Sequence, residues 1–380
     1  MKILLIIDQY DSGNNGTTMS AQRLAHTLMA HGHQVRVVST GAEKDGKYRV
    51  AEYYLTPLVR SLVHKEGMTF GKPDDSLLAQ AISWADVVHL MLPFSLARHG
   101  LKIARELEVP VTAAFHVQPE NITYAIGLGH RRSVNDWLYD VQRRRFYDQI
   151  RHIHVPSAFM ADQLRQHGYT NAIHVISNGV DPDFHWRKAP KDPAFRGKFI
   201  ILMIGRYANE KRQDVLIDAI RRSPYQGMIQ LVLAGKGPEA RRLHRLGRRL
   251  YNPPVFRFYS HDDLLDLLAQ CDLYVHASDA ESEAISCIEA FSCGLVPVIA
   301  DSPLSATPQF ARDPWSLFEA GNSRDLCGHI TYWMTHPGER RAMEKVYADY
   351  GATFNLDTCV RQMEALFEEA IADAQKPSDC

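Results

Sequence analysis

The sequence of 380 residues has no long hydrophobic run and no paired cysteine motif. No uncharged apolar segment approaches the roughly 20 residues that a membrane-spanning helix needs. The six cysteines lie in the second half without a CxxC pair, which argues against a disulfide framework and a zinc site. The apolar start reaches Asp8 without a cleavage site, a pattern typical of a buried strand rather than a signal peptide. We therefore expect a soluble or peripheral protein in the cytoplasm.

Neither sign of charge dominates, because 43 Lys and Arg stand against 44 Asp and Glu. Such a balance creates no overall field that would attract nucleic acid, so we expect no nucleic-acid partner, and any basic surface must be local. The length exceeds what one core comfortably serves and favours two domains of roughly 150 to 200 residues each.

Two series of short apolar strands alternate with helical stretches, which predicts two parallel α/β sheets covered by helices. A Gly-, Pro- and Asp-rich segment at residues 177–197 separates the series and is the expected linker. We expect domains at 1–177 and 178–355, followed by a C-terminal helix within 356–380. The expected strands lie at residues 2–8, 34–39, 85–90, 110–116, 198–205, 229–235, 255–259 and 272–277, with helices at 17–30, 213–222 and 357–374.

Ligands of open parallel sheets bind where strands end and helices begin. The first such junction, residues 8–18, contains Gly13 and Gly16, which permit a tight loop whose amides can face an anion. The alternative is an ordinary turn capped by Thr17 or Thr18. This segment alone does not decide between the two.

The second junction, residues 204–214, places Arg206 just after a strand and Lys211 at a helix start. Two cations there can meet one diphosphate, and fixed positive charge stabilises a leaving nucleotide as negative charge develops on it. The alternative is a pair of solvated side chains on a loop.

The third junction, residues 277–300, contains Glu281 and Glu289 with seven residues between them. The amides of Ala284, Ile285 and Ser286 at the helix start would point at a phosphate. One carboxylate can accept from sugar hydroxyls and the other from a ribose diol. Surface charge is the weaker alternative, since the flanking residues are apolar.

These segments together resemble the retaining glycosyltransferases of family 4, which have the GT-B architecture. The resemblance rests on the glycine-bearing first loop, SNGVD at 177–181, GRYANEK at 205–211, AGKGPE at 234–239 and the two glutamates at 281 and 289. It implies two Rossmann-like parallel-sheet domains facing across a cleft, with an N-terminal acceptor domain and a C-terminal donor domain. It also implies that the last helix packs back toward the N-terminal domain.

The resemblance implies a role for individual residues. Arg206 and Lys211 would hold the donor diphosphate, Glu281 the donor-sugar hydroxyls and Glu289 the ribose. His116 would lie against the donor sugar near the anomeric carbon, although a lone histidine after a strand is more often a core or loop residue. The other donor-binding positions expected are Gly13, Gly16, Gly205, Gly235, Tyr259, Ala284, Ile285 and Ser286.

The implied reaction moves a hexose or a derivative from a UDP- or GDP-sugar to a hydroxyl of a glycan, glycolipid or lipid-linked acceptor. The implied route is a front-face transfer with retention, in which the leaving phosphate helps to deprotonate the acceptor. The sequence shows no pair of carboxylates at the spacing of glycosidases, so nothing in it indicates a covalent glycosyl-enzyme intermediate. Asp181 and Asp183 form a DxD string only within the linker, so we predict no catalytic metal and no other cofactor.

Several positions depart from the family pattern. Ala284 replaces a usual glycine, Glu283 adds negative charge beside the expected phosphate, and Tyr259 and Ser260 stand where relatives often have glycine near the nucleobase. The alternatives are a nucleotide-sugar epimerase and a non-catalytic nucleotide-sugar-binding protein. The family motifs argue against the first, and His116 with the cation pair argues against the second.

Residues 129–150 combine five arginines with aromatic and apolar side chains. A helix of this kind can rest on an anionic membrane, which gives the hypothesis of peripheral contact with the inner face of the cell membrane. A plain amphipathic helix with a solvated basic face is the alternative. The residues concerned are Arg131, Arg132, Trp137, Leu138, Tyr139, Arg143, Arg144, Arg145 and Phe146.

Overall fold

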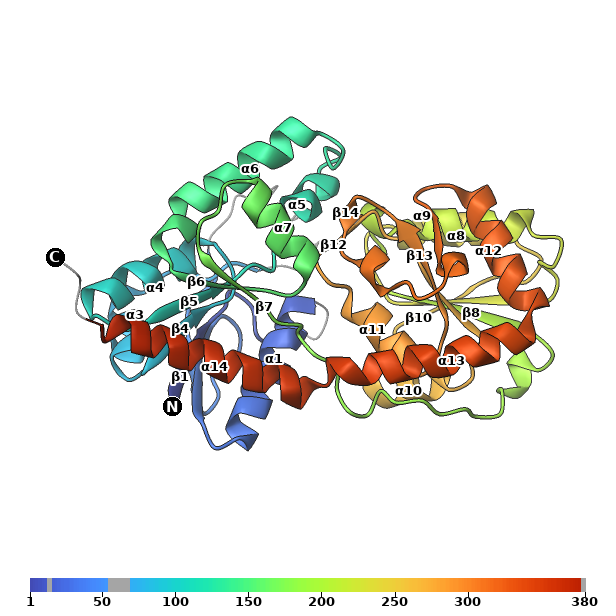
Figure 1. Cartoon of the computed structure of the whole chain (residues 1–380). Coiled ribbons are helices and arrows are strands. Elements are labelled where there is room, and N and C mark those ends of the chain that lie inside the picture. Colours follow the sequence, from blue (N-terminus) through green and yellow to red (C-terminus); the bar gives the residue numbers. More distant parts are fainter. Residues whose placement is uncertain (12–15, 54–68, 377–380) are drawn as a thin grey trace. The chain divides into compact units, whose positions relative to one another are not determined.

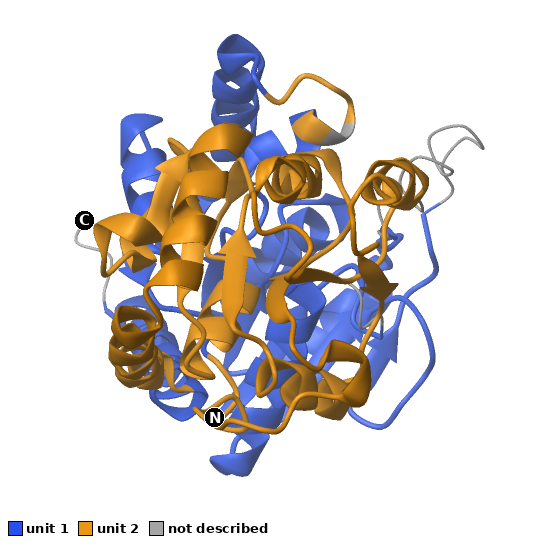
Figure 2. Ribbon diagram, turned by 90° about the vertical axis from the view of Figure 1, so that its right-hand side faces the viewer, with its two compact units in different colours: residues 1–123, 130–179, 356–380 blue, residues 124–129, 180–355 orange. Residues whose placement is uncertain are grey.

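The computed structural model describes residues 1–11, 16–53 and 69–376, which form two compact units (Figure 2). Unit 1 comprises residues 1–123, 130–179 and 356–380, and unit 2 comprises 124–129 and 180–355. The C-terminal helix thus belongs to the same unit as the N-terminal strands. The units divide after residue 179, inside the segment expected to be the linker.

The described part of unit 1 contains a seven-stranded parallel sheet in the order β3-β2-β1-β4-β5-β6-β7 (Figure 1). The order reverses between β1 and β4, and such a switch point is where open sheets bind ligands. The strands are Lys2–Ile6 (β1), Gln34–Ser39 (β2), Lys47–Arg49 (β3), Val87–Leu90 (β4), Val111–Ala114 (β5), His152–Val155 (β6) and Ala172–Val175 (β7).

Helices cover both faces of this sheet. Ile3 and Leu5 of β1 pack with α1 and α14, while Leu4 and Ile6 pack with α3, α4, α6 and α7, because successive side chains of a strand point to opposite faces. The helices of this part of the chain are Gly16–Ala30 (α1), Asp75–Ser83 (α3), Ser95–Glu106 (α4), Pro119–Ala125 (α5), Arg132–Arg145 (α6), Ala158–Gln166 (α7) and Leu356–Ala374 (α14).

Within its described residues, unit 2 has a six-stranded parallel sheet in the order β10-β9-β8-β11-β13-β15, whose switch point lies between β8 and β11. A short parallel pair, β12 with β14, lies outside it. The strands are Phe199–Ile204 (β8), Ile229–Ala234 (β9), Val255–Arg257 (β10), Leu273–His276 (β11), Ala280–Glu281 (β12), Pro297–Asp301 (β13), Leu304–Ser305 (β14) and Leu317–Glu319 (β15).

The helices of unit 2 pack on a single buried apolar cluster that includes β8, β9, β11 and β13. They are Gln213–Arg222 (α8), Ala240–Gly247 (α9), His261–Leu268 (α10), Ile285–Ser292 (α11), Ser323–Thr335 (α12) and Pro337–Gly351 (α13). Short 3-10 turns lie at Tyr147–Gln149, Pro193–Phe195, Asn209–Lys211, Thr307–Phe310, Pro314–Ser316 and Ala352–Phe354.

The α/β class and the two parallel sheets are confirmed. Every strand predicted in the two series is present, and the predicted helix at 213–222 is α8. The alternative of a helix cap at Thr17 or Thr18 is wrong, since α1 begins at Gly16 and both threonines lie inside it. Across the ranges that the structure describes, each helix is too short or too polar to cross a bilayer.

Asp8, which follows β1, generates a prediction about pH. Asp8 is 2% exposed. One oxygen of its carboxylate accepts a hydrogen bond from the amide of Gly71 at 2.9 Å, and the other oxygen has no partner among the described residues. Burial raises the pKa of Asp8 from 3.8 to about 7, although the bond from Gly71 opposes the shift. The folded state therefore loses stability as the pH rises from 4 through 7, because it resists an ionisation that the unfolded chain undergoes freely.

We expect Asp8→Asn to raise the free energy of unfolding at pH 8, by up to about 4 kcal/mol, and to have little effect at pH 4. Denaturant unfolding at both pH values measures this. Asp11→Asn is the control with the opposite sign at pH 8, because Asp11 forms ion pairs with Lys44 and Lys47. An equal effect of Asp8→Asn at both pH values would contradict the ionisation argument.

Candidate donor site at the switch point of unit 2

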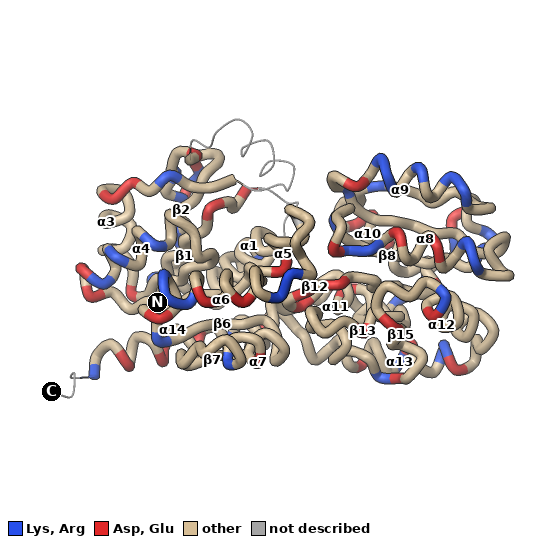
Figure 3. Tube along the Cα trace, turned by 90° about the horizontal axis from the view of Figure 1, so that it is seen from above, with Lys and Arg blue, Asp and Glu red and all other residues tan. Residues whose placement is uncertain are grey.

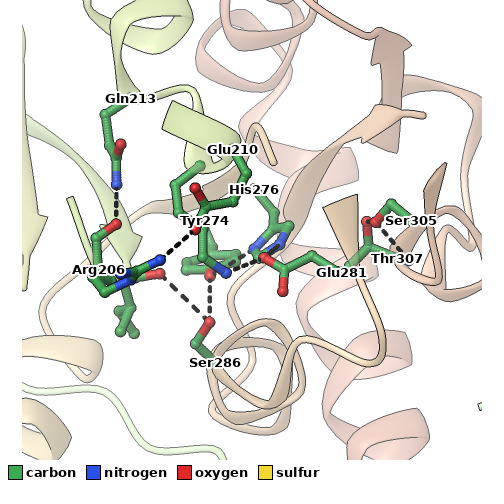
Figure 4. Close-up of polar contacts among 11 residues, drawn as sticks. Arg206, Glu210, Gln213, Tyr274, His276, Glu281, Ser286, Ser305 and Thr307 are labelled. Atoms are coloured by element: carbon green, nitrogen blue, oxygen red, sulfur yellow. Dashed lines mark hydrogen bonds and ion pairs between the residues drawn. The ribbon is translucent and has the colours of Figure 1, made fainter. Parts of the chain in front are cut away.

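Charged and polar side chains gather where β8 and β11 end, at the switch point of the second sheet (Figure 4). Arg206 and Lys211 follow β8, Glu281 lies in β12 just after β11, and Ser286 is in the first turn of α11. The structure thus brings together in one unit four residues that the sequence singled out separately.

Lys211 and Glu281 form the central ion pair of this network. Lys211 Nζ donates to Glu281 Oε1 at 2.5 Å, and His276 Nε2 lies 3.0 Å from the same oxygen. Burial alone would raise the pKa of Glu281, but the charge of Lys211 and the hydrogen bond of His276 outweigh it and hold this pKa well below its usual value. The carboxylate is therefore ionised and fixed, with its other oxygen outside this ion pair.

A chain of polar contacts extends from His276 to the start of α11. His276 Nδ1 lies 3.1 Å from the Tyr274 hydroxyl, which donates to Ser286 Oγ at 3.3 Å. Ser286 in turn donates to the carbonyl of Ile204 at 3.4 Å. The strand ends of β8 and β11 and the helix α11 are thereby fixed relative to each other.

Arg206 is held from two sides. Its guanidinium donates to Glu210 Oε1 at 2.9 Å, and Gln213 Nε2 donates to its carbonyl at 2.8 Å. Glu210 is buried, whereas the Arg206 side chain is 28% exposed. The Arg206 side chain is therefore only partly exposed beside the end of β8.

The first turn of α11 presents amides rather than a side-chain cap. Ala284 is the N-cap residue and has left-handed backbone angles, φ 69° and ψ 67°. Among the described residues, the amides of Ile285 and Ser286 make no hydrogen bond. Free amides at a helix N-terminus favour an anion.

Gly205 and Gly235 are explained by backbone packing. A Cβ on Gly235 would overlap the carbonyl of Gly205, and Gly205 itself has φ 153°. The loops after β8 and β9 can approach each other only because Gly235 lacks a side chain, and Gly205 is suited to its place by its backbone angle. Their place beside Arg206 agrees with a donor site, but their presence does not require a ligand.

The remaining donor-side residues also belong to unit 2. Glu289 lies in α11 and is 8% exposed, and Glu283, just before this helix, is buried. Tyr259 follows β10 and is half-buried, with the guanidinium of Arg257 4.9 Å from its ring. Asp181 accepts from the amide of Asp183 in a local turn.

His116 lies in unit 1, two residues after β5. Burial, with a smaller contribution from His154, lowers the pKa of His116 to about 3, so the imidazole is neutral near pH 7. Its Nε2 is buried and has no partner among the described residues. A neutral imidazole can donate or accept a hydrogen bond without adding charge.

Two further buried histidines accompany His116. The ring of His154 lies edge-on at 5.5 Å, with its Nε2 2.7 Å from the carbonyl of Ile176, and His89 Nδ1 lies 2.8 Å from the Thr112 hydroxyl. All three rings border a cavity of about 20 Å³, which matches roughly one water molecule. The sequence does not reveal this cluster, because its members are far apart in the chain.

The first loop is only partly described. Gly13 lies outside the described residues, and Gly16 is the first residue of α1. Sequence analysis also missed Tyr274 and His276. They alternate with apolar residues in β11, and only their common side of the strand would have marked them as partners for Glu281 and Ser286.

Two family models match consecutive parts of the chain. The model described as Glycosyltransferase Family 4 matches residues 14–184, and the model described as Glycosyl transferases group 1 matches residues 185–348. The chain belongs to this glycosyltransferase family. The resemblance drawn from the sequence motifs is thereby confirmed.

Relatives of known activity match most of this glycosyltransferase. The GDP-mannose-dependent alpha-mannosyltransferase of Corynebacterium glutamicum is 28% identical over 79% of the chain and 72% of its own length. The alpha-monoglucosyldiacylglycerol synthase of Streptococcus pneumoniae is 25% identical over 79% of the chain and 71% of its own length. The crystal structure of HepE of Anabaena in complex with UDP-glucose aligns with a TM-score of 0.76 at 17% identity, covering 97% of this chain and 100% of that one, which shows the shared GT-B fold.

The backbone at Ala284 generates a prediction about stability in this glycosyltransferase. A left-handed conformation costs a residue with a Cβ about 1–2 kcal/mol, and glycine adopts it freely. We expect Ala284→Gly to raise the free energy of unfolding by about 1 kcal/mol. The same change at Ala290, inside α11, is the matched control and should lower it by about 1 kcal/mol or more. Destabilisation by both changes in denaturant melts would refute the strain.

Proposed function

We propose that this glycosyltransferase moves a hexose from a nucleotide diphosphate sugar to an acceptor hydroxyl, with retention at the anomeric carbon. The observation that carries the proposal is the assembly of Arg206, Lys211 and the free amides of α11 at one switch point. These groups are positive and fixed before any ligand arrives, so they can stabilise the charge that develops on a leaving diphosphate.

The carboxylates of the site divide into two kinds. Glu210 and Glu281 hold the cations in place, and the second oxygen of Glu281 is proposed to accept from hydroxyls of the donor sugar. Glu289 is proposed to accept from the ribose. Since Glu281 stays ionised even when buried, it can accept but not donate, and this suits hydroxyl recognition rather than proton transfer to a leaving group.

We further propose that the neutral His116 contacts the donor sugar near the reacting carbon. A depressed pKa removes the imidazole as a strong base, which agrees with a front-face transfer in which the leaving phosphate takes the acceptor proton. Neither this step nor the diphosphate contacts invoke a metal ion. We therefore propose that transfer needs no divalent cation.

The donor base and the acceptor follow from the relatives only as classes. One relative is named for GDP-mannose, and HepE is bound to UDP-glucose, so both UDP- and GDP-sugars are proposed as donors to test. The glycolipid made by the Streptococcus pneumoniae relative makes a lipid-linked or glycolipid acceptor the first class to test. Membership of polysaccharide or glycolipid biosynthesis follows from that proposal.

Arg206→Gln tests the proposed site, because glutamine can still bond to Glu210 while the positive charge is lost. We expect kcat for donor turnover to fall by about 10²–10³-fold, as is usual when one preorganised donor to a developing anion is removed. Nucleotide release is measured over a panel of UDP- and GDP-sugars in EDTA, where the parent should remain active.

Arg221→Gln is the matched control, since Arg221 lies on α8 in the same unit and pairs with Asp218 on the surface. It should leave kcat unchanged. Equal rates for both variants would remove Arg206 from the site. Absence of turnover of every donor by the parent, together with thermal stabilisation by a nucleotide sugar, would favour a non-catalytic binding protein.

Only part of the segment 129–150 exposes side chains that suit the hypothesis of membrane contact. Tyr139 and Phe146 are buried in the core of unit 1, and Arg143 and Arg144 form ion pairs with Asp140. The N-terminal half of α6 keeps the required chemistry, because Trp137 is 60% exposed. We propose that this half, with Arg131 and Arg132, contacts an anionic bilayer; Arg132 Nε lies 3.8 Å from Asp136 Oδ2, but its side chain is 94% exposed.

A second basic surface, missed in the sequence, runs along α9 (Figure 3). The arginines of residues 241–249 are all exposed, but the helix itself exposes no large apolar side chain that could enter a bilayer. Interfacial binding needs both charge and an apolar anchor. The arginines are Arg241, Arg242, Arg245, Arg248 and Arg249.

The two surfaces serve as controls for each other. We expect the triple variant Arg131→Ser, Arg132→Ser, Trp137→Ser to lose at least about ten-fold in affinity for phosphatidylglycerol vesicles at low salt, at about 1 kcal/mol per basic residue. Sedimentation with vesicles measures this. The variant Arg241→Ser, Arg245→Ser, Arg248→Ser should bind like the parent. A loss in the α9 variant alone would assign the contact to unit 2.

A further inference from the structure

Two histidines near the edge of the unit 1 sheet contact two carboxylates that lie far from them along the chain. His152 opens β6, His174 lies in the edge strand β7, and Glu369 and Asp373 lie on α14. One ligating atom each of His152, His174 and Glu369 lies within 4.8 Å of the other two. Within the described residues, this is the one group of its kind that could hold a metal ion.

The four side chains contact one another through their ring nitrogens and carboxylate oxygens. His152 Nε2 lies 3.1 Å from Asp373 Oδ2, and His174 Nδ1 lies 4.0 Å from Glu369 Oε2. Because His152 Nε2 is within hydrogen-bond distance of a carboxylate, it is best satisfied as an N–H donor. A neutral imidazole carries one N–H, so the lone pair of the His152 ring is on Nδ1.

That lone pair faces His174 Nε2 at 3.1 Å. With the proton of its ring on Nε2, His174 donates an N–H···N bond to His152; with the proton on Nδ1, both facing nitrogens offer lone pairs to one cation. The same geometry therefore serves a hydrogen bond in the metal-free protein and two ligands of one metal ion.

The distances suit a small tetrahedral ion. Nitrogens bound at 2.0–2.1 Å in a tetrahedron lie about 3.3–3.4 Å apart, close to the 3.1 Å observed. Glu369 Oε1 lies 3.9 Å from His152 Nδ1, and the three ligating atoms lie within 4.8 Å of one another. The Glu369 side chain is 54% exposed, so its carboxylate has room to approach both nitrogens. Asp373 then completes the carboxylate–histidine–metal arrangement that fixes a ligating ring.

We propose that His152, His174 and Glu369 bind one divalent transition-metal ion, with zinc as the best match and water as the fourth ligand. Asp373 orients His152 through its Nε2 proton. The ion has no part in sugar transfer, because His152 lies at the amino end of β6, whereas ligands of parallel sheets bind at the carboxyl ends.

The effect of the ion is to fasten the end of the chain. His152 and His174 precede residues 180–355 of unit 2 in the sequence, and Glu369 follows them. Linking them closes a loop that contains all of residues 180–355, and closing a long loop gives a large entropic stabilisation in principle. The ion therefore holds α14 on the sheet of unit 1.

Titration of the chelator-treated, untagged full chain with Zn²⁺ in a calorimeter tests the site. We expect one equivalent to bind, Co²⁺ to give the visible absorption of a tetrahedral complex, and the melting temperature to rise with Zn²⁺ concentration. His174→Gln should weaken binding at least 100-fold, and Asp373→Asn by about 10–100-fold. His174 is on an edge strand and partly exposed, so the variant should keep the metal-free melting temperature of the parent.

His99→Gln is the matched control, because His99 is an exposed histidine of the same unit that pairs with Asp75. It should bind Zn²⁺ like the parent. Binding by the parent that is no tighter than that of His174→Gln would overturn the proposal and leave the two rings as a proton-linked pair. Binding lost equally in His99→Gln would assign the ion to another place.

Discussion

The buried carboxylate of Glu281 is the charge on which the arrangement of the donor site depends. An unpaired buried charge costs several kcal/mol, so Glu281 can lie behind the strand ends only with Lys211 and His276 in place. These partners come from the loop after β8 and from β11. The ion pair therefore does two things at once: it joins the loops of the switch point, and it fixes a cation where the proposed diphosphate would lie.

The two units contribute different kinds of polar group to the proposed reaction. Unit 2 supplies fixed charge of both signs around α11, whereas unit 1 supplies buried histidines whose pKa values burial holds low, as for His116 and His154. Fixed charge stabilises a diphosphate, and a neutral ring can contact a sugar without competing for that charge. This difference explains why the candidate residues of unit 2, which are charged and stand in short motifs, are easier to recognise in the sequence than the histidines of unit 1.

The sequence predicted the parallel sheets because each central strand is a nearly continuous apolar run, and α8 because its periodicity is clear. It also singled out Arg206, Lys211 and Glu281, which stand in short motifs that the fold brings together, although their roles stay a prediction. It could not predict His276, which sits inside an apolar strand and becomes a partner of Glu281 only through the fold. Nor could it explain Gly235, where a Cβ would overlap the carbonyl of Gly205. These two residues lie about 30 positions apart, so no single motif shows this packing constraint.

The C-terminal helix imposes an order on the completion of the fold. Residues of α14, among them Val360, Met363 and Phe367, pack with β1 and α1 in the core of unit 1. The part of this face that α1 does not cover stays exposed until the last helix has been made, and an uncovered apolar surface is unfavourable in water. Residues 180–355, which make up most of unit 2, lie between these two ends of the chain and can fold around their own core first. The stability of unit 1 therefore depends on both ends of the chain. Contacts between α14 and the sheet, such as that of His152 with Asp373, stabilise unit 1 by holding its last helix in place.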